Sequence, residues 1–306
     1  MRLITRADFD GLVCGAILME LGLIDRWKFV HPKDLQDGKI EVSDDDILTN
    51  VPYAEGCCMW FDHHTSELER VGMDVNVEGA QYAAPSAARI VYEYYDGATR
   101  LPYLEEMVTA VDKVDSARLT VDEIINPKGW VLLGFIMDPR TGLGRHHKFS
   151  VGNWELMEEL MDACRDFNID ELLMLPNVAE RIEYFNKQTD EFREMILKYS
   201  HPNDQVVITD VRGVNPIATG NRFLLYSLFP DQNISIWIAD GLVGNTMIAV
   251  GHSITNRSST VDVGRYMMKH GGGGHSKVGT CQVPSADADS IVQLLIEEFN
   301  QHDIAG

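Results

Sequence analysis

The sequence predicts an α/β fold in two domains, with a parallel sheet in the first domain. From residue 1 to about 125, short apolar runs typical of strands alternate with segments of helical periodicity, which is the pattern of a parallel sheet. Between residues 130 and 199 helical periodicity takes over, and strand patterns return after residue 204. The 306 residues exceed the usual size of one domain, and a hydrophobic content of 45% can fill two cores.

We therefore expect a first domain over residues 1–200, which includes a helical insert and ends in a linking helix. A smaller, mixed α/β domain is expected over residues 201–306, with strands at 205–209, 234–238 and 246–250, where β-branched residues are dense. A cleft between the two domains is the expected location of a substrate.

Two carboxylates separate the first predicted strand from the first predicted helix. Residues 1–6 are predicted as a strand, 7–11 as a turn and 12–21 as a helix, so Asp8 and Asp10 lie between strand and helix. Ligands bind beyond the carboxyl ends of strands in open α/β sheets, and side chains two apart on an extended segment face the same side. Both carboxylates would then face one cation, although Asp10 is also a common helix-capping residue.

A second predicted strand ends in an acidic residue and two histidines. The apolar run that contains Trp60 and Phe61 is followed by Asp62, His63 and His64. Oxygen and nitrogen ligands in this mixture suit Mn²⁺, Fe²⁺ or Zn²⁺ better than Ca²⁺. The tripeptide alone fits a solvated loop equally well. A metal site is favoured because the first predicted strand also ends in carboxylates, those of Asp8 and Asp10.

These clusters resemble motifs of a known family. Residues 7–11 (ADFDG) and 62–64 (DHH) are similar to the first and third motifs of the DHH phosphoesterase superfamily. Residues 270–279 (HGGGGHSKVG) resemble the glycine-rich signature of the DHH-associated C-terminal domain, and residues 253–258 resemble the strand that precedes it. The resemblance covers nearly the whole chain. It implies a parallel-sheet DHH domain followed by a substrate-binding domain, as in exopolyphosphatase-related proteins, nano-RNases and RecJ exonucleases.

The resemblance also implies a divalent-metal centre that holds Mn²⁺ or another divalent ion such as Mg²⁺. The implied ligands are Asp8, Asp10, Asn50, Asp62, His63, Asp112 and Asp115. Asn50 departs from the family pattern, in which an Asp commonly bridges two metals, because an amide oxygen carries no charge. Asp112 and Asp115 share one predicted helical face, so we expect one of them to be a ligand and the other its partner. A surface turn with salt bridges around Lys113 is the alternative.

Catalytic and substrate-binding residues follow from the same resemblance. Asp62 and His64 are the expected catalytic residues, with His64 donating to the substrate phosphate or orienting a ligand. The expected phosphate-binding residues are Arg257, Ser258, Gly272, Gly273, Gly274 and His275. Arginine binds phosphate through its planar fork, and glycines allow close backbone approach. A flexible linker is the alternative for the glycine run.

A further polar cluster lies in a glycine-rich stretch of the chain. His146 and His147 follow Arg140 and Arg145 there. A solvated loop is the favoured interpretation of this cluster over a substrate contact.

Composition restricts the partners. With 47 acidic and 26 basic residues, the formal net charge is −21, which excludes long duplex nucleic acid and favours a small phosphorylated substrate or a short oligonucleotide. No apolar run approaches the ~18 residues of a membrane span, and the acidic N-terminal residues are unlike a signal peptide. The five cysteines are odd in number, as expected of reduced thiols in a cytoplasmic protein. A homodimer is left open.

We therefore predict a metal-dependent phosphohydrolase that acts on a short phosphodiester or phosphoanhydride through metal-activated water. A short oligonucleotide, a nucleotide bisphosphate and an oligophosphate all meet this description. The alternative is a non-hydrolytic phosphate- or nucleotide-binding protein whose metal centre is weakened by Asn50. Retention of so many clustered carboxylates favours the enzyme, because like charges destabilise a site that holds no cation.

Overall fold

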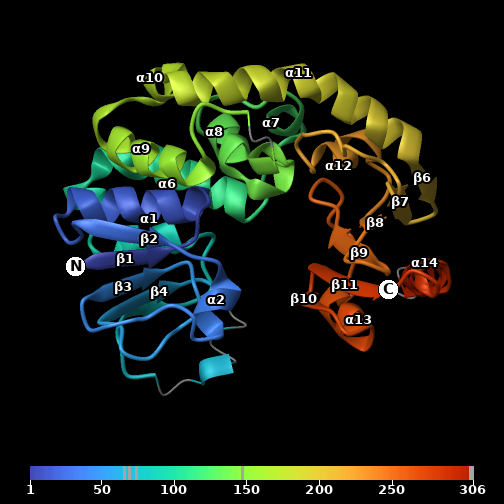
Figure 1. Ribbon diagram of the computed structural model, residues 1–306, viewed down its shortest axis with the longest axis horizontal. Coiled ribbons are helices and arrows are strands. Elements are labelled where there is room, and N and C mark those ends of the chain that lie inside the picture. Colours follow the sequence, from blue (N-terminus) through green and yellow to red (C-terminus); the bar gives the residue numbers. More distant parts are fainter. Residues whose placement is uncertain (65–66, 68–69, 73–74, 146–147, 303–306) are drawn as a thin grey trace. The chain divides into compact units, whose positions relative to one another are not determined.

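The computed structural model describes residues 1–64, 67, 70–72, 75–145 and 148–302 (Figure 1). The chain forms two compact units: unit 1 comprises Met1–Arg118 and Asn126–Phe185, and unit 2 comprises Leu119–Ile125 and Asn186–Gly306. Unit 1 contains a five-stranded parallel sheet and unit 2 a six-stranded mixed sheet, so the predicted fold class is confirmed. The predicted domain limits, 1–200 and 201–306, stay a prediction.

Unit 1 is an α/β unit whose strand order is β2-β1-β3-β4-β5, with every neighbouring pair parallel. Its strands are β1 (Arg2–Thr5), β2 (Arg26–Phe29), β3 (Asp46–Thr49), β4 (Met59–Asp62) and β5 (Glu78–Gln81). Its helices are α1 (Phe9–Glu20), α2 (Pro32–Gln36), α4 (Ala87–Tyr94), α5 (Gly97–Arg100), α6 (Glu105–Asp115), α8 (Gly129–Met137), α9 (Asn153–Asp166), α10 (Ile169–Met174) and the first part of α11 (Pro176–Tyr199). Short 3-10 turns cover Pro102–Leu104, Pro139–Thr141 and Leu143–Arg145.

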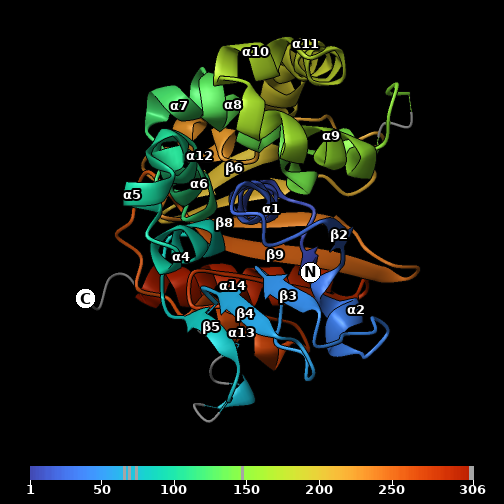
Figure 2. The ribbon, with the colours of Figure 1, turned by 90° about the vertical axis from the view of Figure 1, so that its left-hand side faces the viewer.

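The two faces of this sheet are covered by different cores, because successive residues of a strand point to opposite faces. Leu3 and Phe61 belong to the larger core, which contains α1 and parts of α4, α6 and α9. Ile4 and Trp60 belong to a smaller core that includes Leu35 of α2. Figures 1 and 2 show α1 lying directly along the sheet. The strand ends that carry the candidate site are therefore fixed by packing on both faces.

The first helix begins earlier than the sequence analysis predicts. α1 begins at Phe9, and its N-cap Asp8 accepts the N–H of Gly11 at 3.0 Å. Asp10 therefore lies in the first helical turn, and the prediction that both carboxylates share one extended segment was wrong. The cap bond is the physical reason, since it starts the helix at the first carboxylate.

Unit 2 is built around a sheet of order β10-β11-β9-β8-β7-β6, in which β7 and β8 are parallel and the other neighbours antiparallel. Its strands are β6 (Ser200–Asn203), β7 (Val206–Asp210), β8 (Ile234–Asp240), β9 (Asn245–His252), β10 (Gly273–His275) and β11 (Val278–Pro284). Its helices are α7 (Val121–Ile125), the last part of α11, α12 (Leu224–Leu228), α13 (Val263–Lys269) and α14 (Ala288–His302).

The strands predicted at 205–209, 234–238 and 246–250 appear as β7, β8 and β9, whereas β6, β10 and β11 were not predicted. Residues 253–258, which resemble a strand of the family, form bends and a turn after β9, so that expectation was wrong. α13 and α14 contribute to one core of unit 2, through residues such as Met267 and Phe299. Phe192 and Ile196 of α11 join a second core together with Leu225 of α12. Among the described residues, no helix combines the length and the apolar character that crossing a membrane requires.

The glycine run that follows α13 is structured rather than a flexible linker. Gly271 has a φ of 74°, and the N–H of Gly272 donates to the carbonyl of Met267 at 2.9 Å, which closes the helix end. A Cβ atom at Gly272 would lie 2.2 Å from the carbonyl oxygen of Thr280, whereas one at Gly273 would meet nothing within 4 Å. Gly272 is therefore needed for the close approach to the backbone of β11, whereas Gly273 has room for a side chain.

Gly272→Ala is expected to destabilise unit 2 by about 1–3 kcal/mol, because the new methyl group overlaps the backbone of β11. Gly273→Ala is the matched control and is expected to stay within about 0.5 kcal/mol of the parent protein. Urea unfolding measures both changes, and hydrogen exchange of β11 assigns the loss to unit 2. Equal destabilisation by the two substitutions would contradict this account of the run.

Candidate metal centre

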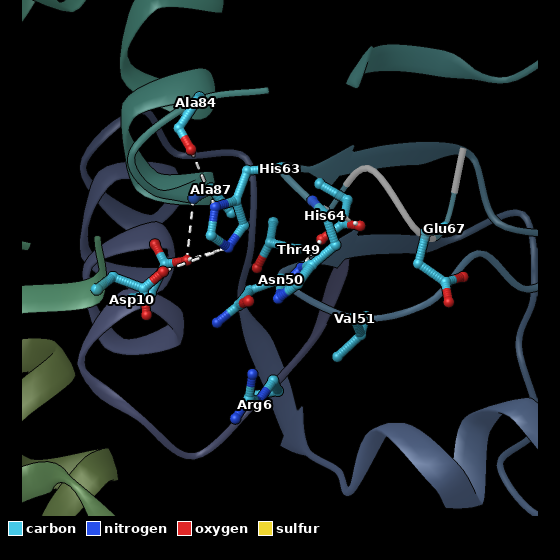
Figure 3. A network of polar contacts seen from close by, with 12 residues as sticks. Arg6, Asp10, Thr49, Asn50, Val51, His63, His64, Glu67, Ala84 and Ala87 are labelled. Atoms are coloured by element: carbon cyan, nitrogen blue, oxygen red, sulfur yellow. Dashed lines mark hydrogen bonds and ion pairs between the residues drawn. The ribbon is translucent and has the colours of Figure 1, made fainter. Parts of the chain in front are cut away.

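Polar side chains gather beyond the carboxyl ends of three neighbouring strands of unit 1. β1, β3 and β4 are adjacent in the sheet. The residues at these ends are Asp8 and Asp10 after β1, Asn50 after β3, and Asp62, His63 and His64 at the end of β4. Because the carboxyl ends of parallel strands meet at one edge, the structure brings these predicted site residues together. Figure 3 shows four of them at close range.

Asp10 is a buried carboxylate held by the start of a helix. It is 2% exposed, and one of its oxygens accepts the backbone N–H of Ala87 at 2.9 Å (Figure 3). The other oxygen accepts the backbone N–H of Ala88 at 2.7 Å. These are the first residues of α4, where a helix presents partial positive charge. Burial raises the pKa of Asp10 well above its ordinary value, and the charges of Asp115 and Asp8 raise it further. A cation at this position would favour the ionised carboxylate.

His63 presents a ring nitrogen to the same position. Its Nδ1 lies 3.2 Å from the carbonyl oxygen of Ala84, and since a carbonyl only accepts, Nδ1 carries the proton. Nε2 is then the basic nitrogen, and it lies 3.4 Å from Asp115 Oδ2 and 3.8 Å from Asp10 Oδ2. Nε2 is buried and forms no hydrogen bond in the described structure. Burial lowers the pKa of His63 and so favours the neutral form, which is the form that binds metals.

Asp10, His63 and Asp115 form a group that fits a divalent metal ion. One ligand atom from each lies within 4.8 Å of the others, and among the described residues this is the only such group of three or more acidic, histidine or cysteine side chains. The orphaned nitrogen of His63 and two close carboxylates supply a nitrogen and at least two oxygens. A divalent cation satisfies the nitrogen and offsets the repulsion between the carboxylates.

Asp112 has a different environment from Asp115. Its Oδ1 accepts the hydroxyl of Ser86 at 2.7 Å, and its Oδ2 accepts Nε of Arg89 at 2.8 Å. Ser86 is the N-cap of α4, and its hydroxyl also accepts the N–H of Arg89. Asp112 therefore fixes the helix end that holds Asp10, while Asp115 lies beside the predicted ligands. That one of the two is a ligand and the other its partner stays a prediction.

Asp8 lies next to this group and is surrounded by hydrogen-bond donors. Its Oδ1 accepts the N–H of Gly11 and the side-chain amide of Asn50, each at 3.0 Å, and its Oδ2 lies 3.1 Å from Nε of Arg6. Arg6 was not predicted as a site residue. The sequence offered little signal for it, because it occupies a strand end where the family resemblance gave no role.

Asp62 and His64 form a hydrogen-bonded pair. Nδ1 of His64 lies 2.8 Å from Asp62 Oδ1, and the backbone N–H of His64 donates to Asp62 Oδ2 at 3.4 Å. Burial lowers the pKa of His64, but the hydrogen bond and the charge of Asp62 outweigh it and leave the pKa raised. The pair is therefore suited to keep a proton on His64. The metal-ligand role predicted for Asp62 stays a prediction.

A small cavity of about 180 Å³ opens beside these residues in unit 1. Its walls are formed by Arg6, Pro32, Gln36, Asn50, Val51, Pro52, His64 and Glu67. Three of the wall residues belong to the site: Asn50 is a predicted ligand, Arg6 is paired with Asp8, and His64 is paired with Asp62. Figure 3 shows these three around a common space. The cavity has room and donors for a phosphate group.

Arg140 is a second cationic group that was not predicted as a site residue. Its Nε donates to Asp138 Oδ1 at 2.7 Å. Burial leaves the pKa of Asp115 raised, although the charges of His63 and Arg140 act to lower it. The glycine-rich stretch around Arg140 gave no reason to connect it with the other motifs. His146 and His147, named with it in the sequence analysis, lie outside the described residues.

The substrate-binding residues predicted for the second domain all lie in unit 2. Nε of Arg257 donates to the carbonyl of Ile254 at 3.0 Å, and the hydroxyl of Ser258 donates to the side chain of Asn256 at 2.8 Å. The remaining predicted residues lie in and just before β10. Gly272 is half-buried, whereas Gly273, Gly274 and His275 are exposed. Their role in binding substrate stays a prediction.

Comparisons with known proteins identify similar solved structures. The chain is 43% identical to a pGpG-specific phosphodiesterase, PggH from Vibrio cholerae, with a TM-score of 0.87 over 98% of this chain and 99% of that one. It also shares its fold with RecJ from Thermus thermophilus in complex with Mn²⁺, at 12% identity and a TM-score of 0.54, over 98% of this chain and 52% of that one. No protein-family model matches the chain, and no curated protein matches it in sequence.

Asp115→Asn is expected to weaken Mn²⁺ binding by more than about 100-fold, because it removes a charged ligand from the centre. Asp112→Asn is expected to weaken it by only about 10-fold, since Asp112 acts through Ser86 and the start of α4. Isothermal titration calorimetry measures both affinities. Asp162→Asn, an equal charge change on the exposed surface of α9, is the control. A larger loss for Asp112→Asn than for Asp115→Asn would reverse the assignment.

Proposed function

This chain belongs to the DHH phosphoesterase family, and we propose that it is a phosphodiesterase that hydrolyses linear dinucleotides such as pGpG to mononucleotides. The predicted phosphohydrolase of short substrates is confirmed by the similarity to enzymes of this family, and the non-hydrolytic alternative has no similar support. The observation that carries the choice of substrate is the 43% identity, over nearly the full length of both chains, to a pGpG-specific phosphodiesterase.

The charge of the chain supports a short substrate. A formal net charge of −21 repels a long polyanion, which would need a basic stripe to neutralise several phosphates. A dinucleotide has one internal phosphodiester and one terminal phosphate at most. Local donors such as Arg6 and His64, together with one cationic centre, are sufficient to bind such a group against the overall charge.

The metal centre supplies the electrophilic part of the reaction. Asp10, His63 and Asp115 would hold the divalent ion, which, when bound, neutralises phosphate oxygens and makes water a better nucleophile. Among divalent ions, Mn²⁺ suits a site that combines an imidazole nitrogen with carboxylates better than Mg²⁺ or Ca²⁺ does. The carbonyl of Ala84 keeps Nε2 of His63 unprotonated and aimed at the centre.

The pair of Asp62 and His64 supplies a proton at the edge of the cavity. Asp62 fixes the orientation of the His64 ring through Nδ1, and His64 lines the cavity. In hydrolysis, a water oxygen bonds to phosphorus while the bond from phosphorus to the 3′ oxygen breaks, and that leaving oxygen requires a proton. His64 is the group that we propose to donate it.

A panel of substrates tests this function. With Mn²⁺ present, pGpG is expected to yield GMP, with a kcat/KM at least about 100-fold above that for cyclic dinucleotides, tetra- and pentaribonucleotides, 3′-phosphoadenosine 5′-phosphate and tripolyphosphate. Chromatography of the products measures the rates. Asp115→Asn is expected to abolish turnover, which excludes a contaminating nuclease. Efficient cleavage of a phosphate oligomer, with none of pGpG, would refute the proposed substrate.

A further inference from the structure

Asp8 and Asn50 are hydrogen-bonded to each other beside the predicted ligands Asp10, His63 and Asp115. The carboxylate of Asp8 already accepts hydrogen bonds from neutral donors and pairs with the charged guanidinium of Arg6. A carboxylate has about four acceptor sites. Three of those on Asp8 are filled, by the N–H of Gly11, the amide of Asn50 and the guanidinium of Arg6. A cation bound to Asp8 would have to displace at least one of these donors.

The amide of Asn50 has only one orientation that fits its surroundings. Because the carboxylate of Asp8 only accepts hydrogen bonds, the NH₂ group of Asn50 must face it, and Oδ1 faces away. Asn50 is 1% exposed, and its Oδ1 has no hydrogen-bond partner among the described residues. Its left-handed backbone, with a φ of 53°, and the bond from its N–H to the carbonyl of Phe61 at 3.0 Å fix it at the end of β3.

A second metal ion would lack the ligands that it needs. Hydrolytic centres with two metals hold them about 3.5–4 Å apart, and at that distance two divalent ions repel strongly unless carboxylates neutralise them. Within the described part of the chain, Asp10, His63 and Asp115 form the one ligand group. The other carboxylates of the site are paired with basic side chains, Asp8 with Arg6 and Asp62 with His64. Asp10, by contrast, accepts neutral backbone N–H groups, which leave its negative charge uncompensated.

Arg6 is placed to supply the second positive charge. Its side chain is 34% exposed and lines the cavity of about 180 Å³ together with Asn50 and His64. The ion pair with Asp8 uses Nε, and the two terminal nitrogens of a guanidinium carry further N–H groups in a planar fork that matches phosphate oxygens. Asp8 thereby fixes the direction of the guanidinium.

We propose that this centre holds a single divalent cation, and that Arg6, held by Asp8 and Asn50, binds the scissile phosphate where a second cation would otherwise lie. The inference rests on the proposed phosphodiesterase function. One divalent ion and one guanidinium carry enough charge for about one phosphate group. The single-metal centre is thus consistent with a short substrate.

The metal content of the full chain tests the first half of the proposal. After equilibrium dialysis against excess Mn²⁺, mass spectrometry of the metal is expected to give one ion per chain. Asn50→Asp is expected to give two, because it replaces the neutral amide by a carboxylate, and aspartate tolerates the left-handed backbone as asparagine does. Asn168→Asp adds the same charge at the exposed N-cap of α10, where aspartate caps equally well, and is expected to give one.

Arg6 substitutions test the second half. Arg6→Ala is expected to lower kcat/KM for the dinucleotide by about 100-fold, as loss of one donor to a reacting phosphate does, while the Mn²⁺ content stays at one. Arg6→Lys is expected to recover part of the loss, because it keeps the charge but not the fork. Loss of metal from Arg6→Ala would assign Arg6 to the metal centre and overturn its role on the phosphate.

The outcomes separate this inference from the proposed function. Two Mn²⁺ ions per parent chain, with dinucleotide hydrolysis intact, would overturn the single-metal centre and leave the function standing. A content of one ion in Asn50→Asp would overturn the claim that Asn50 limits the centre. No bound metal and no hydrolysis in the folded parent chain would refute both.

Discussion

The whole site depends on how the start of α4 holds the buried carboxylate of Asp10. Two backbone N–H groups bind that carboxylate, and Ser86 caps the same helix while it donates to Asp112. Without these bonds, a carboxylate that is 2% exposed and close to other acids would have little to offset its desolvation. Even with these bonds the pKa of Asp10 is raised, mainly by burial. The fold therefore holds this carboxylate where its negative charge is unfavourable, and a bound divalent ion would stabilise that charge.

Hydrogen-bonding partners outside the ligand group give each site residue its function. The carbonyl of Ala84 selects the tautomer of His63, Asp62 selects that of His64, and Asn50 and Arg6 occupy Asp8. His63 and His64 therefore have different roles although they are adjacent in sequence, and so do Asp8 and Asp10, which are two positions apart. An excess of acidic residues across the chain is compatible with an anionic substrate because the donors are concentrated at one edge of a single sheet.

The sequence was sufficient to predict the α/β class, the strand ends and most residues that gather there, because apolar runs and the polar residues that terminate them are local signals. The sequence prediction placed the start of α1 too late, because a helix capped by Asp8 and a helix capped by Asp10 have the same sequence signature. It left Asp112 and Asp115 unresolved, because their difference lies in contacts with Ser86, Arg89 and His63, which are distant in sequence. Arg6 and Arg140 have local partners, Asp8 and Asp138. They were not predicted because the groups that connect them with the site are distant in sequence: Asn50 and His64 for Arg6, and Asp115 for Arg140.

The most direct test of the central claim is a crystal structure of the protein with Mn²⁺, with anomalous diffraction used to locate the metal. We predict a peak about 2 Å from Nε2 of His63 and from a carboxylate oxygen of Asp10 and of Asp115. A peak that contacts Asp8 and Asp62 but none of these three side chains would contradict it.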